Sequence, residues 1–159
     1  MSIKTEAQYF SSVIIRDISF FGSYVFVLVA FLLMLIFNQI QLAKYYFVGV
    51  TLVTAIELFI KVLYHNKRPD FKQVHPYSGF QKFEEGSSFP SGHSGNAALF
   101  TSLMHIYYHM LPLTIMFSII AIYVGISRIF LKRHFIQDVL CGFAIGIGVA
   151  ILTTQFLVL

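Results

Sequence analysis

The stretch Ser127–Asp138, SRIFLKRHFIQD, separates two apolar runs and holds five ionisable side chains. The runs cover about residues 112–131 and 134–159. Each is near the roughly 20 residues that an α-helix needs to cross the hydrocarbon of a bilayer. A charged turn between apolar runs of this length predicts two membrane-spanning helices that are joined at a membrane surface.

The composition indicates a membrane protein. Of 159 residues, 57% are hydrophobic and 11% are charged, whereas about 25% of residues are charged in soluble domains. The net charge is +4, and the basic residues gather near three polar stretches. This placement favours anionic headgroups or phosphates as partners over nucleic acid. We expect a single domain over residues 1–159.

The hydropathy pattern predicts an all-α, polytopic membrane helix bundle. Apolar runs at about 20–37, 45–64 and 93–110 precede the two runs described above, which makes five transmembrane helices. Residues 1–19 mix polar and apolar side chains in a helical rhythm, and this pattern predicts an amphipathic helix in the membrane interface. Residues 65–92 form a polar loop, which we interpret as the active-site loop.

Three glycines of the last run, Gly142, Gly146 and Gly148, are predicted points of close helix packing. The spacing of Gly142 and Gly146 favours packing inside one bundle, and a dimer face is the alternative. The oligomeric state stays open.

Following the chain through five crossings brings three polar stretches to the same side of the membrane. These stretches are residues 61–69, 90–93 and 127–138. The spans are assigned from hydropathy alone, so the convergence independently supports one common site.

The third stretch has the residues of a nucleophilic centre. His134 and Asp138 are four residues apart at the start of a helix, so they share a face. A carboxylate there can bond one imidazole nitrogen, which fixes the tautomer and leaves the other nitrogen free to attack. Arg128 lies just before the intervening loop, and its planar guanidinium suits bidentate contact with the same phosphate.

The other two stretches supply groups that bind an anion. Ser91 and Gly92 lie in a turn that opens a helix, where backbone N–H groups, a hydroxyl and the helix dipole can hold a phosphate. His93 follows and can protonate a departing oxygen. Lys61 and Arg68 can neutralise the remaining phosphate oxygens, where transition-state charge gathers.

Each stretch alone has a simpler explanation. The His–Asp pair can be a cap or a salt bridge, and the Ser-Gly-His turn can be a plain helix cap. Lys61 and Arg68 can be flanking charges that reach the headgroups. The order of all three on one face of the membrane favours the common site.

The three stretches together resemble the type 2 phosphatidic acid phosphatases, the membrane relatives of the vanadium haloperoxidases. That family's pattern is Lys, six residues and Arg-Pro, then Pro-Ser-Gly-His, then Ser-Arg, five residues, His, three residues and Asp. The chain matches this pattern at Lys61–Pro69, Pro90–His93 and Ser127–Asp138.

The resemblance implies a phosphatase that needs no metal and no cofactor. His134 would form a phosphohistidine, Asp138 would orient it, and His93 would be the acid for the leaving group. The implied phosphate-binding residues are Lys61, Arg68, Ser91, Gly92 and Arg128. Family members often have three spans before the first motif, whereas this chain has two and the amphipathic segment, which can replace a helix.

The implied substrate is a lipid phosphate or diphosphate: undecaprenyl diphosphate, phosphatidylglycerol phosphate, phosphatidate or the phosphates of lipid A. A lipid phosphotransferase of the same superfamily is one alternative. A non-enzymatic, lipid-binding membrane scaffold is another, but it does not explain why His134 and Asp138 share a face beside Arg128.

Two arguments about orientation in a bacterial inner membrane disagree. Of the 11 Lys and Arg residues, all but Lys44 lie on the side of the three stretches, which would make that side cytoplasmic. Many bacterial members of the family face the opposite way. We predict an extracytoplasmic site, because anion-binding residues inflate the charge count.

Several titratable residues lie outside the pattern. Glu57 is four residues before Lys61 in the same span, which predicts an ion pair that holds Lys61 in place. Four residues flank the site as headgroup-facing charges, or else tune the choice of substrate: His65, Lys67, Lys132 and Arg133. His105 and His109 are expected at the opposite side, in structural roles.

Overall fold

The fold was analysed from a computed structural model, which describes residues 18–64, 66–69 and 87–156. The amphipathic helix predicted over 1–19 lies almost wholly outside the described residues, as does most of the 65–92 loop. In chain order the elements are η1 (Phe20–Gly22), α2 (Tyr24–Ile36), α3 (Ile40–Leu63), α5 (Gly92–Tyr108), α6 (Leu111–Phe130) and α7 (Ile136–Phe156).

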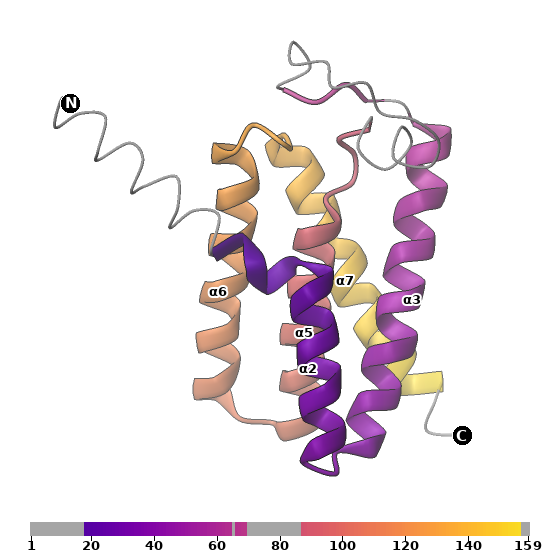
Figure 1. The fold of residues 1–159 in the computed structure, drawn as a ribbon, viewed down its shortest axis with the longest axis vertical. Helices are drawn as coiled ribbons and strands as arrows, with labels where there is room; N and C mark the ends of the chain where they lie inside the picture. The colour runs from indigo at the N-terminus through magenta and orange to yellow at the C-terminus, as the bar shows by residue number, and fades with distance from the viewer. Residues whose placement is uncertain (1–17, 65, 70–86, 157–159) are drawn as a thin grey trace, which may run out of the picture.

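The predicted membrane helix bundle is confirmed (Figure 1). In the described residues, three helices are long and apolar enough to cross a membrane, namely α3, α6 and α7. Large apolar side chains are exposed on their outer faces, among them Phe59, Ile119 and Leu140. Contiguous apolar surface of this kind suits contact with lipid.

The first predicted span is shorter in the structure. Ser23 caps α2, because its side-chain oxygen accepts a hydrogen bond from the Phe26 N–H at 3.3 Å. The 13 residues of α2 give a length of about 20 Å at 1.5 Å per residue, whereas the hydrocarbon core is ~30 Å thick. The preceding residues form the separate turn η1, so one continuous span over 20–37 does not form.

Close contact between α5 and α7 depends on two glycines. A Cβ at Gly142 would collide with the carbonyl oxygen of Ser91, and a Cβ at Gly146 with that of Gly95. The predicted packing inside one bundle is confirmed for both glycines. The prediction is wrong for Gly148, where an added Cβ would meet no atom within 4 Å.

An aromatic cluster joins α5 to three other helices. The ring of Phe100 makes edge-to-face contacts with Phe26 on α2, Tyr46 on α3 and Phe117 on α6, with centroid distances of 5.1, 5.7 and 5.0 Å. Such pairs stabilise a core beyond the area they bury. The cluster fixes α5 at the centre of the bundle.

The three polar stretches meet at one end of the bundle. Figure 1 shows at its upper end the last turn of α3, the start of α5, the last turn of α6 and the start of α7. This arrangement confirms the predicted topology for these helices.

Candidate active site

A cavity of about 190 Å³ opens at this end of the bundle. Six of the eight predicted site residues line it, and Ser91 and Asp138 are buried outside the lining. The full lining is Tyr24, Glu57, Lys61, Arg68, Gly92, His93, Asn96, Arg128, Arg133 and His134. Residues from four helices and two connecting segments therefore share one cavity.

The charge of the lining favours an anion. Four cationic side chains and one carboxylate lie around the cavity. Because the surrounding bundle is apolar, water screens these charges less than it would at an open surface. A phosphate group is an anion of suitable charge for this cavity.

Glu57 and Lys61 form a buried ion pair on α3. The Lys61 Nζ donates to the Glu57 carboxylate, and both side chains are almost fully buried. The predicted pair is confirmed. It fixes the Lys61 ammonium at the cavity wall and partly neutralises it before any anion arrives.

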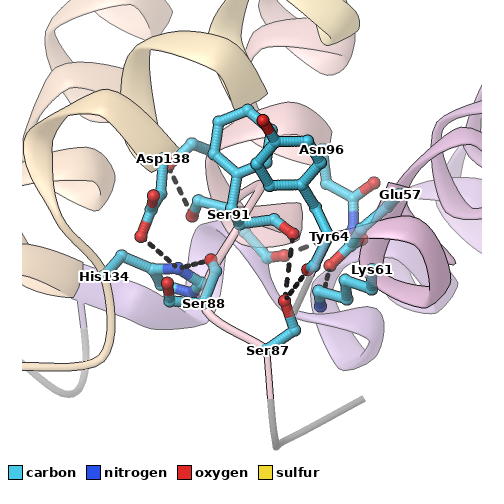
Figure 2. A network of polar contacts seen from close by, with 12 residues as sticks. Glu57, Lys61, Tyr64, Ser87, Ser88, Ser91, Asn96, His134 and Asp138 are labelled. Atoms are coloured by element: carbon cyan, nitrogen blue, oxygen red, sulfur yellow. Dashed lines mark hydrogen bonds and ion pairs between the residues drawn. The ribbon is translucent and has the colours of Figure 1, made fainter. Parts of the chain in front are cut away.

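The Glu57 carboxylate lies so close to the backbone at position 92 that only glycine fits there. A Cβ at Gly92 would collide with both carboxylate oxygens of Glu57. The absence of a side chain thus lets the first turn of α5 reach the ion pair. Figure 2 shows Lys61 and Glu57 on one side of this turn, with His134 and Asp138 on the other.

Arg128 is held at the end of α6 by Ser19. Its Nη1 donates to the Ser19 hydroxyl at 2.8 Å. Its Nε is buried and has no hydrogen-bond partner among the described residues. Since the guanidinium has five N–H donors, it retains donors for an anion in the cavity.

The loop after α6 places His134 beside Arg128. The backbone N–H groups of Arg133 and His134 both donate to the Arg128 carbonyl, at 3.1 and 3.3 Å. Lys132 turns the chain with a φ of 55°. The loop therefore brings Arg128 and His134 together at the cavity.

The hydrogen bonding of His134 determines its tautomer. Its Nδ1 lies 2.6 Å from the backbone carbonyl of Ser88, as drawn in Figure 2. A carbonyl oxygen only accepts, so Nδ1 carries the hydrogen and Nε2 keeps its lone pair in the neutral ring. His134 therefore presents the tautomer that a nucleophile at Nε2 requires.

The surroundings of His134 also favour its neutral form. Burial lowers its pKa below the ordinary value, and Arg128 and Arg68 lower it further. The nearby Asp138 carboxylate and the hydrogen bond to the Ser88 carbonyl oppose this shift without reversing it. A neutral imidazole is the reactive form in nucleophilic attack.

Asp138 is fully buried and contacts two groups. Its Oδ2 accepts a hydrogen bond from the Phe135 N–H at 2.8 Å, which caps the start of α7. The same oxygen lies 3.7 Å from His134 Nδ1. The predicted His–Asp proximity is present, but the Ser88 carbonyl is the nearer acceptor for the imidazole.

Ser91 joins α5 to α7. Its N–H donates to the Asp138 carbonyl at 3.0 Å, and its hydroxyl is 2.9 Å from the Ser94 hydroxyl. These are the groups that we expected to face an anion. In the structure both groups hydrogen-bond within the protein, so Ser91 stabilises the turn instead of facing an anion.

Sequence reasoning missed three residues of the lining or its support. Ser88 acts through a backbone carbonyl, which every residue has, so no sequence signal distinguishes it. Asn96 is a buried polar residue one turn beyond His93, and that position was a usable signal. Tyr24 belongs to the shortened first span. Arg133 was assigned to the flanking charges, and it lines the cavity.

His105 and His109 are far from the site, as predicted, whereas His65 lies outside the described residues. His105 and His109 lie at the opposite end of α5, where His105 Nδ1 is 2.9 Å from the Thr114 hydroxyl. Within the described ranges, no three His, Cys, Asp or Glu side chains gather as a metal-binding cluster.

The chain is 39% identical over 98 residues to phosphatidylglycerophosphatase B of Bacillus subtilis, covering 56% of this chain and 45% of that relative. It is 40% identical over 63 residues to a lipid A 1-phosphatase of Porphyromonas gingivalis, covering 38% of this chain and 14% of that relative. The matched stretches thus span less than half the length of these relatives.

Two crystal structures have a similar fold. One is LpxE of Aquifex aeolicus, with a TM-score of 0.77 and 21% identity, covering 92% of this chain and 87% of that one. The other is a transmembrane PAP2-type phosphatidylglycerolphosphate phosphatase of Bacillus subtilis, with a TM-score of 0.74 and 27% identity, covering 92% and 76%. The sequence model of the PAP2 superfamily matches residues 42–158. With most of the sequence matched and the three motifs around one cavity, this integral membrane protein belongs to the PAP2 superfamily.

Proposed function

We propose that this protein is a membrane phosphatase that removes a terminal phosphate from a lipid phosphate or diphosphate. The observation that carries the proposal is the state of His134. Its Nδ1 is held by the Ser88 carbonyl, its lowered pKa favours the neutral ring, and it lies at a cavity lined by Lys61, Arg68 and Arg128. The names of the relatives, phosphatidylglycerophosphatase and lipid A 1-phosphatase, support the same class of reaction.

In the first step, His134 Nε2 attacks the phosphorus atom. A bond forms between Nε2 and phosphorus, and the bond from phosphorus to the lipid oxygen breaks. That oxygen takes a proton from His93, so the lipid leaves as an alcohol or, from a diphosphate, as a monophosphate. Asp138 and the Ser88 carbonyl stabilise the imidazole while it is positively charged.

In the second step, water attacks the phosphohistidine. His93 takes a proton from the water as its oxygen bonds to phosphorus, and the bond to Nε2 breaks. Inorganic phosphate leaves and both histidines return to their starting states. Lys61, Arg68, Arg128 and the Gly92 backbone hold the phosphate oxygens in both steps, and Ser91 fixes the turn that carries Gly92.

The mechanism requires no metal, because cationic side chains supply the charge that neutralises the phosphate. The proposed location is a bacterial inner membrane with the cavity on the extracytoplasmic side. A lipid phosphotransferase, in which the second attack comes from another lipid or a sugar, uses the same first step.

The test is phosphate release by purified protein from a panel of lipid phosphates in the presence of EDTA. The His134→Ala variant is expected to lose ~10⁴-fold or more of the rate. His105→Ala is the matched control, since His105 is a histidine at the other end of α5, and it should retain wild-type activity. Release that requires an added metal would contradict the proposed mechanism.

A second measurement separates the alternatives. Quenching in alkaline SDS, with a lipid that carries ³²P in its terminal phosphate, should trap a phosphoprotein in the wild type and none in His134→Ala, and the trapped label should be stable in base and released by acid. Label that moves to another lipid instead of water would identify a phosphotransferase. A protein that binds lipid without releasing or transferring phosphate would be a scaffold.

A further inference from the structure

Asn96 is a buried polar residue that the proposed mechanism does not use. It lies on α5 three residues after His93, so the two side chains share a face of the helix. It is 3% exposed and lines the cavity. Because α5 begins at the site and runs into the bilayer, Asn96 marks the deeper part of the cavity.

The carboxamide of Asn96 is incompletely paired. Its Nδ2 donates to the Gly22 carbonyl at 3.5 Å, the outer limit of a hydrogen bond. Its Oδ1 is buried and has no donor among the described residues. A buried acceptor without a donor is unfavourable. A leucine, which has the same branched shape without polar atoms, would avoid this cost, so the long bond to Gly22 does not account for the asparagine.

The missing partner of Oδ1 must be a hydrogen-bond donor. An ionised phosphate has only acceptor oxygens, so it cannot be that partner. The terminal torsion of asparagine is soft, and the weak bond to Gly22 allows a small rotation that turns Oδ1 toward the cavity. A hydroxyl group would satisfy it.

The position of Asn96 indicates where this hydroxyl belongs. In the proposed mechanism the phosphate lies between His134 and the cations, and the departing oxygen lies beside His93. Asn96 is one helical turn farther from the membrane surface, on the side of the lipid leaving group. The hydroxyl therefore belongs to the part of the lipid that stays behind after cleavage.

We infer that Asn96 is a specificity-determining residue that accepts a hydrogen bond from a hydroxyl group next to the scissile phosphate. The substrate class is then a lipid with a polyol, a glycerol or a sugar, between the phosphate and the apolar chains. Phosphatidate and polyprenyl diphosphates have no such hydroxyl and are excluded as preferred substrates. The inference rests on the proposed phosphatase function.

The test compares two lipids that differ by one hydroxyl. One is phosphatidylglycerol phosphate, and the other is its analogue with propane-1,3-diol in place of the headgroup glycerol. The wild type should cleave the hydroxyl-bearing lipid with a kcat/KM at least about tenfold higher. In Asn96→Leu this ratio should fall to about one, mainly through slower cleavage of the hydroxyl-bearing lipid.

Thr153→Val is the matched control. Thr153 is also 3% exposed, but its hydroxyl bonds to the Val149 carbonyl of its own helix and does not line the cavity. The ratio should stay at the wild-type value in this variant.

Each other outcome overturns the inference. Equal kcat/KM values for both lipids in the wild type would mean that no hydroxyl is bound, and this comparison needs no variant. If Asn96→Leu slows both lipids by the same factor, Asn96 positions water or His93 instead. Cleavage of phosphatidate or a polyprenyl diphosphate in preference to both lipids would refute the inference and leave the phosphatase function intact. If no lipid phosphate is cleaved at all, the proposed function fails as well.

Discussion

The imidazole of His134, in the loop between α6 and α7, hydrogen-bonds to the backbone carbonyl of Ser88, in the segment before α5. The distance from Nδ1 to the Ser88 carbonyl is 2.6 Å. Ser88 itself is anchored, because its N–H donates to the Asn66 carbonyl at 2.8 Å. The segment before α5 therefore leads into the helix N-terminus at the anion site. It also selects the tautomer of the nucleophile.

Asp138→Asn should be less damaging than His134→Ala. The Ser88 carbonyl still selects the tautomer, and the asparagine oxygen can still accept from the Phe135 N–H. We expect kcat to fall by about 10- to 100-fold, the size of effect seen when a group that supports a functional histidine is lost, because the negative charge beside the imidazole is removed. Steady-state kinetics of both variants on one lipid would check this. Equal loss in the two would mean that the Asp138 charge, and not Ser88, controls the imidazole.

The lowered pKa of His134 predicts how the protonation of its ring depends on pH. Because burial and nearby arginines lower this pKa, the ring should stay neutral as the pH falls through about 6.5, the ordinary value for histidine. It becomes protonated, and unreactive, only at lower pH. An NMR titration of ¹⁵N-histidine-labelled protein, with His134→Ala to assign the signal, should show a midpoint below that value.

Arg68→Gln should move the same midpoint upward, since one of the charges that disfavour imidazolium is removed. A midpoint at or above 6.5 in the wild type, or no change in the variant, would contradict the electrostatic picture of the cavity.

Gly146→Ala and Gly148→Ala should differ in stability. A Cβ at position 146 meets the Gly95 carbonyl of α5, so we expect a loss of about 1–3 kcal/mol from overpacking. At position 148 nothing lies within 4 Å, and alanine should raise stability by up to about 1 kcal/mol through its higher helix propensity. Thermal unfolding in one detergent would measure both, and equal shifts would argue against close contact of α5 and α7.

Arg133→Gln should weaken phosphate binding, and Lys132→Gln should not. Arg133 lines the cavity, whereas its neighbour Lys132 is exposed and absent from the lining. Removing one of four cations should raise the inhibition constant of inorganic phosphate by about three- to tenfold, the effect of roughly 1 kcal/mol. Equal effects of the two substitutions would mean that Arg133 acts only through the general surface potential.

Much of the architecture was accessible from the sequence. The lengths of the apolar runs predicted α3, α6 and α7, because crossing a bilayer demands a minimum number of apolar residues. Because each span carries the chain to the other side of the membrane, the order of the spans then predicted that Lys61, His93 and His134 share one end of the bundle. Local rules also identified the Glu57–Lys61 pair, since residues four apart on a helix are neighbours.

Other features depended on contacts between distant parts of the chain. Ser23 divides the first apolar run because its side chain caps α2, although hydropathy is continuous there. Gly146 faces α5 and Gly148 does not, and only the rotation of α7 against its neighbours separates them. Arg133 and Lys132 are adjacent basic residues that the loop geometry directs to different surroundings.

The sequence by itself determined the membrane helices and the set of reactive groups, because span length, helix periodicity and residue chemistry are local properties of the chain. The tertiary structure alone decided which acceptor holds the His134 ring, which arginines line the cavity and that Asn96 is buried within it. These properties arise from distances between residues that are far apart in the chain, and such distances are set by how the helices pack.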